Sequence, residues 1–130
     1  MLPTVTAKSK QSRALKPSQL VDEIRRGILS GATSTLGMYF DNVGHSVLPI
    51  AMEKKGSKVT VQVYDSNTPE ITQTLRINTK TQVWMYSPVD KTGKTLFTWR
   101  HKGPGALDVI PLVLRTPQET RYFSLSSITE

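Results

Sequence analysis

The sequence predicts an α+β fold in which one N-terminal amphipathic helix precedes an antiparallel sheet or half barrel. Apolar residues first recur at helical spacing, and from Thr35 onward they take the alternating spacing of strands. The later runs are rich in Val, Ile, Thr and Tyr and are separated by Gly, Pro, Asn and Asp. A chain of 130 residues with 37% hydrophobic side chains is sized for a single domain with its own core.

The helix is predicted to begin near Pro17 and to end at Gly31, which is a typical C-terminal residue. Leu20, Ile24 and Ile28 lie four residues apart and share one face, while the charged residues between them lie on the opposite face. This apolar face is expected to pack on the sheet.

Six strands are predicted, separated by turn residues. They cover residues 35–40, 46–53, 58–64, 72–77, 82–86 and 107–114. The segment 87–105 contains several Gly and Pro residues, so we expect it to be mostly loop, with a short piece at 97–99 packed on the sheet.

The charge is concentrated at the N-terminus. The chain has 17 Lys and Arg against 10 Asp and Glu, a net charge of +7, and four of the basic residues come before the first acidic residue, Asp22. This pattern predicts a basic, flexible lead-in or linker over residues 1–16 and a domain over residues 17–130.

Composition excludes several kinds of chemistry within this chain. It has no cysteine, so it has no disulfide, thiolate metal site or cysteine nucleophile. The two histidines, His45 and His101, are too far apart to form a recognisable metal pair, so we expect no metal and no cofactor. The first residues form no apolar signal core, and no apolar run approaches the roughly 18 residues that cross a bilayer. We therefore expect no membrane partner.

Nucleic acid is not the expected partner either. Beyond the lead-in, basic residues are interspersed with acidic ones and show no interleaving with aromatic residues. Trp84, Tyr86 and Trp99 are expected to pack on the sheet rather than to form a stacking platform. A basic surface that binds some other anionic partner remains an alternative.

His45 is the residue best placed for chemistry. It precedes the strand predicted at 46–53, and the next strand ends shortly before Asp65 and Asn67. If the two strands form a hairpin about residues 54–57, a four-residue loop places His45 opposite Ser66 and a three-residue loop places it opposite Asp65. Directly opposed residues have Cβ atoms about 4.5 to 5.5 Å apart, so an acidic or amide side chain here can hold the imidazole ring.

A held histidine supplies the base of a nucleophile–base–orienter system, and the sequence lacks an evident nucleophile. Ser34, Ser46 and Ser66 are the nearby hydroxyls, and none stands in an activating motif. A serine hydrolase is therefore disfavoured. The alternative is that His45 is an ordinary strand-end histidine and that residues 65–67 form an ordinary turn.

Two segments carry a resemblance to a known family. The run Gly-His-Ser-Val-Leu-Pro-Ile at 44–50 is followed by Val-Tyr-Asp-Ser-Asn-Thr-Pro at 63–69 and by a tryptophan in the strand at 82–86. This order resembles the C-terminal, histidine-bearing half of bacterial papain-like cysteine peptidases. The resemblance covers about residues 17–114. It implies a papain-like half-domain, with His45 as catalytic base, Asp65 as its orienter and Asn67 as the competing orienter.

The resemblance also implies that something is missing. In this family the base activates a cysteine on a long helix of the preceding half, and this chain has neither the cysteine nor room for that helix before Pro17. We expect a peptide or protein substrate and a cysteine-bearing half in a separate chain or fragment, or a homodimer. The alternative is a non-catalytic papain-like binding module. The resemblance favours an exported bacterial protein.

Overall fold

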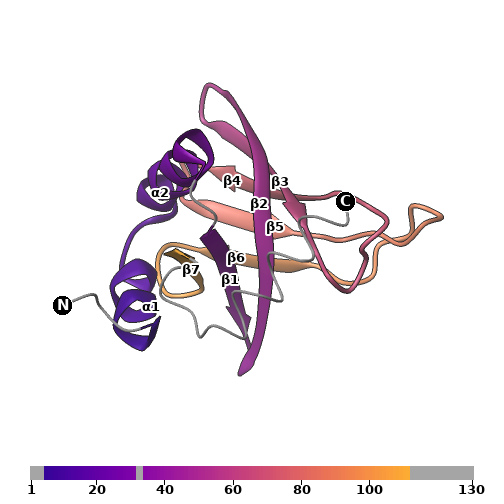
Figure 1. Ribbon diagram of the computed structural model, residues 1–130, viewed down its shortest axis with the longest axis horizontal. Helices are drawn as coiled ribbons and strands as arrows, with labels where there is room; N and C mark the ends of the chain where they lie inside the picture. The colour runs from indigo at the N-terminus through magenta and orange to yellow at the C-terminus, as the bar shows by residue number, and fades with distance from the viewer. Residues whose placement is uncertain (1–4, 32–33, 112–130) are drawn as a thin grey trace.

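A seven-stranded antiparallel sheet curls into a half barrel, and two helices lie beside it (Figure 1). The structure is a computed structural model and describes residues 5–31 and 34–111. The helices are α1 (Val5–Arg13) and α2 (Pro17–Ser30). The strands are β1 (Ser34–Phe40), β2 (Val43–Lys55), β3 (Lys58–Tyr64), β4 (Gln73–Asn78), β5 (Val83–Tyr86), β6 (Trp99–Lys102) and β7 (Leu107–Pro111). These elements confirm the α+β class.

The first six strands pair in chain order, and the chain then returns so that β7 pairs with the free side of β1. The resulting order is β6-β5-β4-β3-β2-β1-β7. The six expected strands correspond to β1–β5 and β7, although β2 begins three residues earlier than expected, at Val43, and residues 112–114 lie outside the described residues. The predicted loop at 87–105 also contains β6, which extends the sheet beyond the short piece expected at 97–99.

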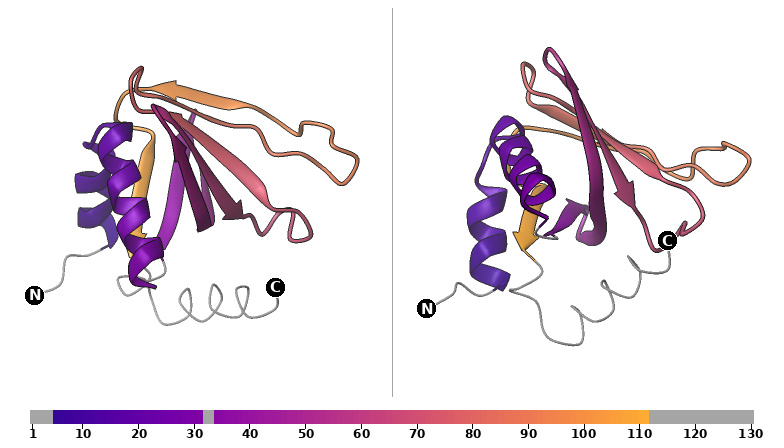
Figure 2. Two further views of the ribbon diagram at one scale, coloured as in Figure 1. Left: turned by 90° about the horizontal axis from the view of Figure 1, so that it is seen from above. Right: turned by 45° about the horizontal axis from the view of Figure 1, so that its top comes forward.

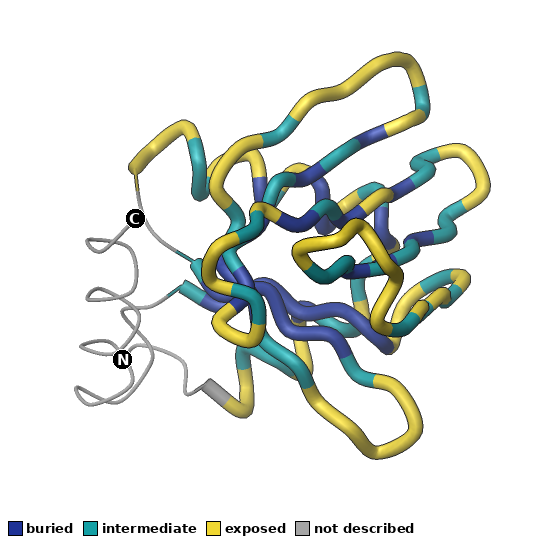
Figure 3. The backbone as a smooth tube through the Cα atoms, turned by 90° about the vertical axis from the view of Figure 1, so that its right-hand side faces the viewer, coloured by how far each residue is buried: buried dark blue, intermediate teal, exposed yellow. Residues whose placement is uncertain are grey.

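The core lies between α2 and the concave face of the sheet. Leu20, Val21 and Ile24 of α2 are buried against it, as their spacing predicts. Figure 3 shows the buried stretches running through the strands, while the loops that connect the strands are mostly exposed. The buried sheet residues of this core include Leu36, Met38, Val47, Val59, Val61, Val63, Leu75, Ile77, Trp84 and Tyr86.

The expectation of a flexible lead-in over residues 1–16 is wrong for residues 5–13, which form α1. Its sequence is too polar to show an apolar stripe, and the helix is held by side-chain hydrogen bonds instead. The Val109 N–H donates to Ser12 Oγ at 2.7 Å, and Arg13 Nε donates to the Gly105 carbonyl at 2.9 Å. Figure 2 shows both helices gathered beside β7. No helix in the described ranges is long and apolar enough to span a membrane.

Strand β7 is buried on both faces because α1 and the core lie on opposite sides of it. Leu107 and Val109 belong to the core cluster, and Asp108 alternates with them on the other face. The Asp108 carboxylate is fully buried and accepts hydrogen bonds at 2.6 Å from Ser9 Oγ and Tyr39 Oη. Burial, together with the bond to Asp108, raises the pKa of Tyr39 above its usual value, so this phenol remains a donor.

The partner strand must leave room for this carboxylate. Gly37 of β1 pairs with Asp108, and its N–H donates to Oδ1 at 3.0 Å. A Cβ atom added at Gly37 would lie 2.3 Å from that same oxygen, which three hydrogen bonds to the carboxylate hold in place. Glycine is therefore required at this position by space rather than by backbone conformation.

We predict that Gly37→Ala lowers the free energy of unfolding by about 2 kcal/mol, because the methyl group displaces the Asp108 carboxylate from its donors. Gly44→Ala is the matched control, since its Cβ would meet the Tyr39 ring at an ordinary 3.4 Å, and it should change stability by less than about 0.5 kcal/mol. Urea unfolding followed by circular dichroism measures both variants. Equal stability of the two would contradict the prediction.

Candidate functional site

The hairpin between β1 and β2 places His45 on the concave face. Asp41 and Asn42 form a two-residue turn with φ of 48° and 65°, the left-handed conformation that a type I′ hairpin turn requires. The turn fixes the register in which Met38 pairs with His45. Met38 belongs to the core, and paired residues share a face, so His45 points to the concave side.

His45 lies within a strand rather than before one. The sequence predicts a strand beginning at Ser46, but β2 begins at Val43 because the tight turn lets pairing with β1 start at once. The backbone of His45 is therefore held by the sheet, and its side chain takes a fixed direction.

The hairpin between β2 and β3 brings Asp65 to His45 by a different route from the one expected. The predicted three- or four-residue loop is wrong, because Lys55 pairs with Lys58 about a two-residue turn whose Gly56 has a φ of 60°. The register then shifts between Pro49 and Ala51, where β2 carries a bulge. The bulge offsets only one residue of this difference, so Leu48 pairs with Tyr64 and Asp65, directly after β3, comes beside Val47. From there the Asp65 side chain reaches the His45 ring diagonally, two residues along β2.

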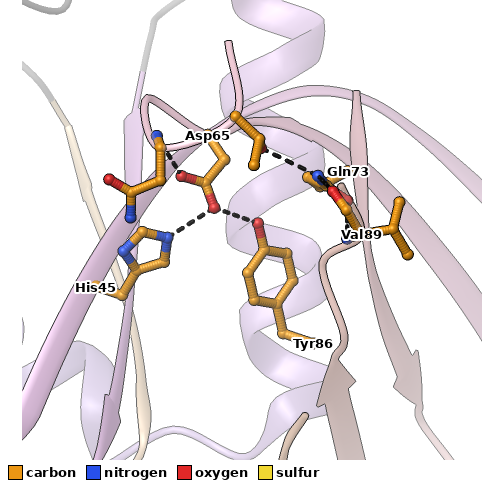
Figure 4. A network of polar contacts seen from close by, with 7 residues as sticks. His45, Asp65, Gln73, Tyr86 and Val89 are labelled. Atoms are coloured by element: carbon orange, nitrogen blue, oxygen red, sulfur yellow. Dashed lines mark hydrogen bonds and ion pairs between the residues drawn. The ribbon is translucent and has the colours of Figure 1, made fainter. Parts of the chain in front are cut away.

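The contacts of the Asp65 carboxylate define the site (Figure 4). Its Oδ2 lies 2.7 Å from His45 Nε2 and accepts a hydrogen bond from Tyr86 Oη at 2.6 Å. Its Oδ1 accepts from the Asn67 N–H at 2.9 Å. Asp65 is therefore the residue that holds the ring, and Asn67, the competing candidate, contributes its backbone N–H to Asp65.

Asp65 is ionised at neutral pH. Burial alone would raise the pKa of this carboxyl, but the hydrogen bonds from His45, Tyr86 and the Asn67 N–H outweigh burial and bring its pKa below the usual value. Burial and the neighbouring Asp65 carboxylate raise the pKa of Tyr86 well above its usual value, so the phenol keeps its proton. A carboxylate can only accept, so His45 carries a proton on Nε2.

The other ring nitrogen, Nδ1, is available. Within the described part of the chain it has no hydrogen-bond partner, and it is not among the buried side-chain atoms that lack one. The His45 side chain is 14% exposed, so Nδ1 keeps access to solvent. A neutral imidazole in this tautomer has its basic lone pair on the accessible nitrogen.

Aromatic side chains form a wall beside the His45 ring. The ring centroid of His45 lies 6.4 Å from that of Phe97 and 6.2 Å from that of Trp99, both edge to face. Trp99 stacks on Phe40 at 5.8 Å, which links β6 to the end of β1. Trp84 and Tyr86 are fully buried, which confirms that these two rings pack in the core.

The three serines considered as nucleophiles and the second histidine all lie away from His45. Ser46 lies on the outer face, where it lines a cleft with Arg13 and Tyr39, and Ser34 lies beside α2 at the start of β1. Ser66 is exposed in the turn after β3. His101 Nε2 lies 3.1 Å from the Pro104 carbonyl oxygen. Among the described residues, no group of three His, Asp or Glu side chains is placed to hold a metal ion.

Sequence reasoning missed two members of this site, Tyr86 and Gln73. The alternation of Trp84 and Tyr86 indicated burial on one face of a strand, but the partner of the phenol depends on the β4–β5 register, in which Tyr86 pairs with Leu75. Gln73 is a buried amide at the first position of β4. Its only sequence signal is a polar residue at an inward position of an alternating strand.

No family model, curated protein or solved structure matches this chain.

We predict that Asp65→Asn lowers the free energy of unfolding at pH 7 by about 2 to 3 kcal/mol, because two donors lose an ionised acceptor. The pKa of this carboxyl is depressed in the folded state, so its contribution is complete above the usual value of 3.8 and is lost as the pH falls through the lower folded value. The difference in free energy of unfolding between wild type and Asp65→Asn should therefore become smaller below about pH 4. Urea unfolding at a series of pH values measures it.

Tyr86→Phe is the matched variant for this titration. It removes one of the three hydrogen bonds to the carboxylate, so the pKa of Asp65 should move up toward its usual value. Carbon-detected NMR of the Asp65 carboxyl follows this shift directly. An Asp65 pKa that is the same in wild type and Tyr86→Phe would contradict the assigned network.

Proposed function

We propose that this chain supplies the general base of a papain-like cysteine peptidase whose nucleophilic cysteine lies in another chain or fragment. The observation that carries the proposal is the pair formed by His45 and Asp65, in which Nε2 is bound to a buried carboxylate and Nδ1 remains open. A base oriented in this way is the part of a nucleophile–base–orienter system that a thiol needs to react.

The chemistry assigned to each group follows from its protonation state. His45 Nδ1 accepts the proton of the incoming thiol, and the ionised Asp65 stabilises the imidazolium that results. The thiolate attacks the peptide carbonyl, and the imidazolium later returns its proton from Nδ1 to the leaving amine. Tyr86 donates to Asp65 throughout and keeps the carboxylate aimed at Nε2.

The nucleophile of the proposed peptidase comes from another chain or fragment because the described residues offer none near His45. The chain has no cysteine, and its serines near the site lie on the outer face, at the far end of β1 or in an exposed turn. No hydroxyl group of the described residues bonds to Nδ1. In this proposal a second polypeptide segment approaches the exposed part of the His45 side chain and brings the thiol to Nδ1.

Exposed apolar side chains support such an approach. Phe40 is 36% exposed and Val43 is 54% exposed, and these two residues form the last pair of the β1–β2 hairpin, near His45. Apolar side chains that remain accessible around a catalytic group are typical of a surface covered in the assembled protein.

We predict that His45→Ala lowers thiol-dependent peptidase activity of the assembled protein at least about 100-fold while leaving the fold intact. The tagged chain is purified from its native source under non-denaturing conditions, its partners are identified by native mass spectrometry, and hydrolysis of fluorescent casein is measured with and without iodoacetamide. Circular dichroism checks the fold of each variant.

Ser46→Ala is the matched control, since Ser46 neighbours His45 in sequence but lies on the other face of the sheet, and its activity should equal that of wild type. Equal activity of His45→Ala and Ser46→Ala would overturn the assignment of the base. A lone chain or a homodimer without iodoacetamide-sensitive activity would indicate the non-catalytic binding module instead.

A further inference from the structure

Gln73 is a buried polar residue whose side-chain amide makes three hydrogen bonds. Both N–H groups donate, and one of the two lone pairs on the oxygen accepts. Gln73 is 3% exposed, and it begins β4. Its Nε2 donates to Thr68 Oγ1 at 3.0 Å and to the Val89 carbonyl at 2.8 Å, and its Oε1 accepts from the Val89 N–H at 3.0 Å. Figure 4 shows Gln73 facing Val89 beside the cluster of Asp65, His45 and Tyr86.

The two hydrogen bonds between the Gln73 amide and the Val89 backbone extend the β4–β5 pairing beyond the point where backbone hydrogen bonds end. Strands β4 and β5 pair up to Leu75 and Tyr86, and the next inward residue of β4, Gln73, comes opposite Pro88, which has no N–H to donate. The Gln73 amide has the same donor and acceptor as a peptide unit. It replaces the missing backbone hydrogen bonds between the two strands by binding the N–H and the carbonyl of Val89, the residue after Pro88.

On one side, Gln73 supports the turn that holds Asp65. The Thr68 N–H donates to the Asp65 carbonyl at 3.0 Å, and the Asn67 N–H donates to the Asp65 carboxylate at 2.9 Å. The bond from Gln73 to the Thr68 hydroxyl fixes this turn against β4. The position of the carboxylate therefore depends on where Thr68 is held.

On the other side, Gln73 supports the loop that carries the aromatic wall. Val89 forms a bridge with Thr95, and the Leu96 N–H donates to the Pro88 carbonyl at 2.8 Å, so the two arms of this loop are closed at its base. The next residue, Phe97, meets the His45 ring edge to face. The Gln73 amide thus connects the turn that carries Asp65 with the loop that carries Phe97, and both residues contact the imidazole.

We propose that Gln73 is a positioning residue, which holds the Asp65 turn and the Phe97 loop at the spacing that fixes the His45 ring. It touches neither the ring nor the nitrogen assigned to proton transfer, so it acts through Asp65 and Phe97. Its effect on peptidase activity rests on the proposed function, whereas its effect on the ring can be measured in the chain by itself.

The test is the His45 Nε2–H signal in proton–nitrogen NMR of wild type and Gln73→Met, which keeps the length of the side chain and removes the amide. Solvent exchange of this proton should become at least tenfold faster in Gln73→Met, and the ring nitrogen shifts should indicate a mixture of tautomers. Thr74→Val is the matched control, because it removes a 3.4 Å contact to Gln62 on the other face of β4, and its ring signals should match wild type.

An unchanged Nε2–H exchange rate and unchanged ring shifts in folded Gln73→Met would overturn the proposal, even if the variant were less stable. If Gln73→Met does not fold, Thr68→Val removes only the bond to the Asp65 turn, and it should accelerate exchange about threefold. Unchanged exchange in folded Thr68→Val would then overturn the proposal.

Peptidase measurements separate this inference from the proposed function. In the assembled enzyme, Gln73→Met should lower kcat about tenfold and leave KM unchanged, because the base is misaligned while substrate binding is not. A perturbed ring with no thiol-dependent activity in any preparation would support the role of Gln73 and contradict the peptidase. Activity that is unaffected by Gln73→Met, with an unperturbed ring, would support the peptidase and overturn the role of Gln73.

Discussion

The ionised carboxylate of Asp65, buried directly after β3, determines how the side chains of His45 and Tyr86 and the turn after β3 are arranged. A buried charge is tolerated only when its lone pairs are satisfied, and three donors from three different parts of the chain converge on this one. His45 comes from β2, Tyr86 from β5 and the Asn67 N–H from the turn after β3. The need to stabilise the buried Asp65 charge thus fixes the tautomer of His45, the position of the Tyr86 hydroxyl and the turn that carries Asn67.

The same chemical solution occurs a second time on the other face of the sheet. Asp108 is also fully buried, and it also receives a tyrosine hydroxyl at 2.6 Å and a backbone N–H. There the third donor is Ser9 of α1 rather than a histidine. One carboxylate therefore attaches a helix to the sheet, and the other orients a titratable ring toward the outside.

Much of the fold follows from sequence periodicity, and the site follows from it only in part. Strand positions and the α2 face were predictable because apolar spacing reports burial directly. Helix α1 was missed because its stability comes from Ser12 and Arg13 bonding to distant main chain, which leaves no periodic signal. The contact between His45 and Asp65 was predicted from a wrong loop length, since turn type and bulge position are local features that alternation does not encode. Tyr86 and Gln73 act through the β4–β5 register and could not be assigned without it.

The two-residue turn at Asp41 and Asn42 has a consequence for how this protein can change in evolution. Side chains alternate between faces along β2, so the identity of the residue facing Asp65 depends on counting from that turn. One residue inserted between Phe40 and His45 would turn the imidazole to the outer face, toward Tyr39 and Arg13, and would bring a neighbouring side chain inward. Length in this short stretch is therefore as constrained as residue identity.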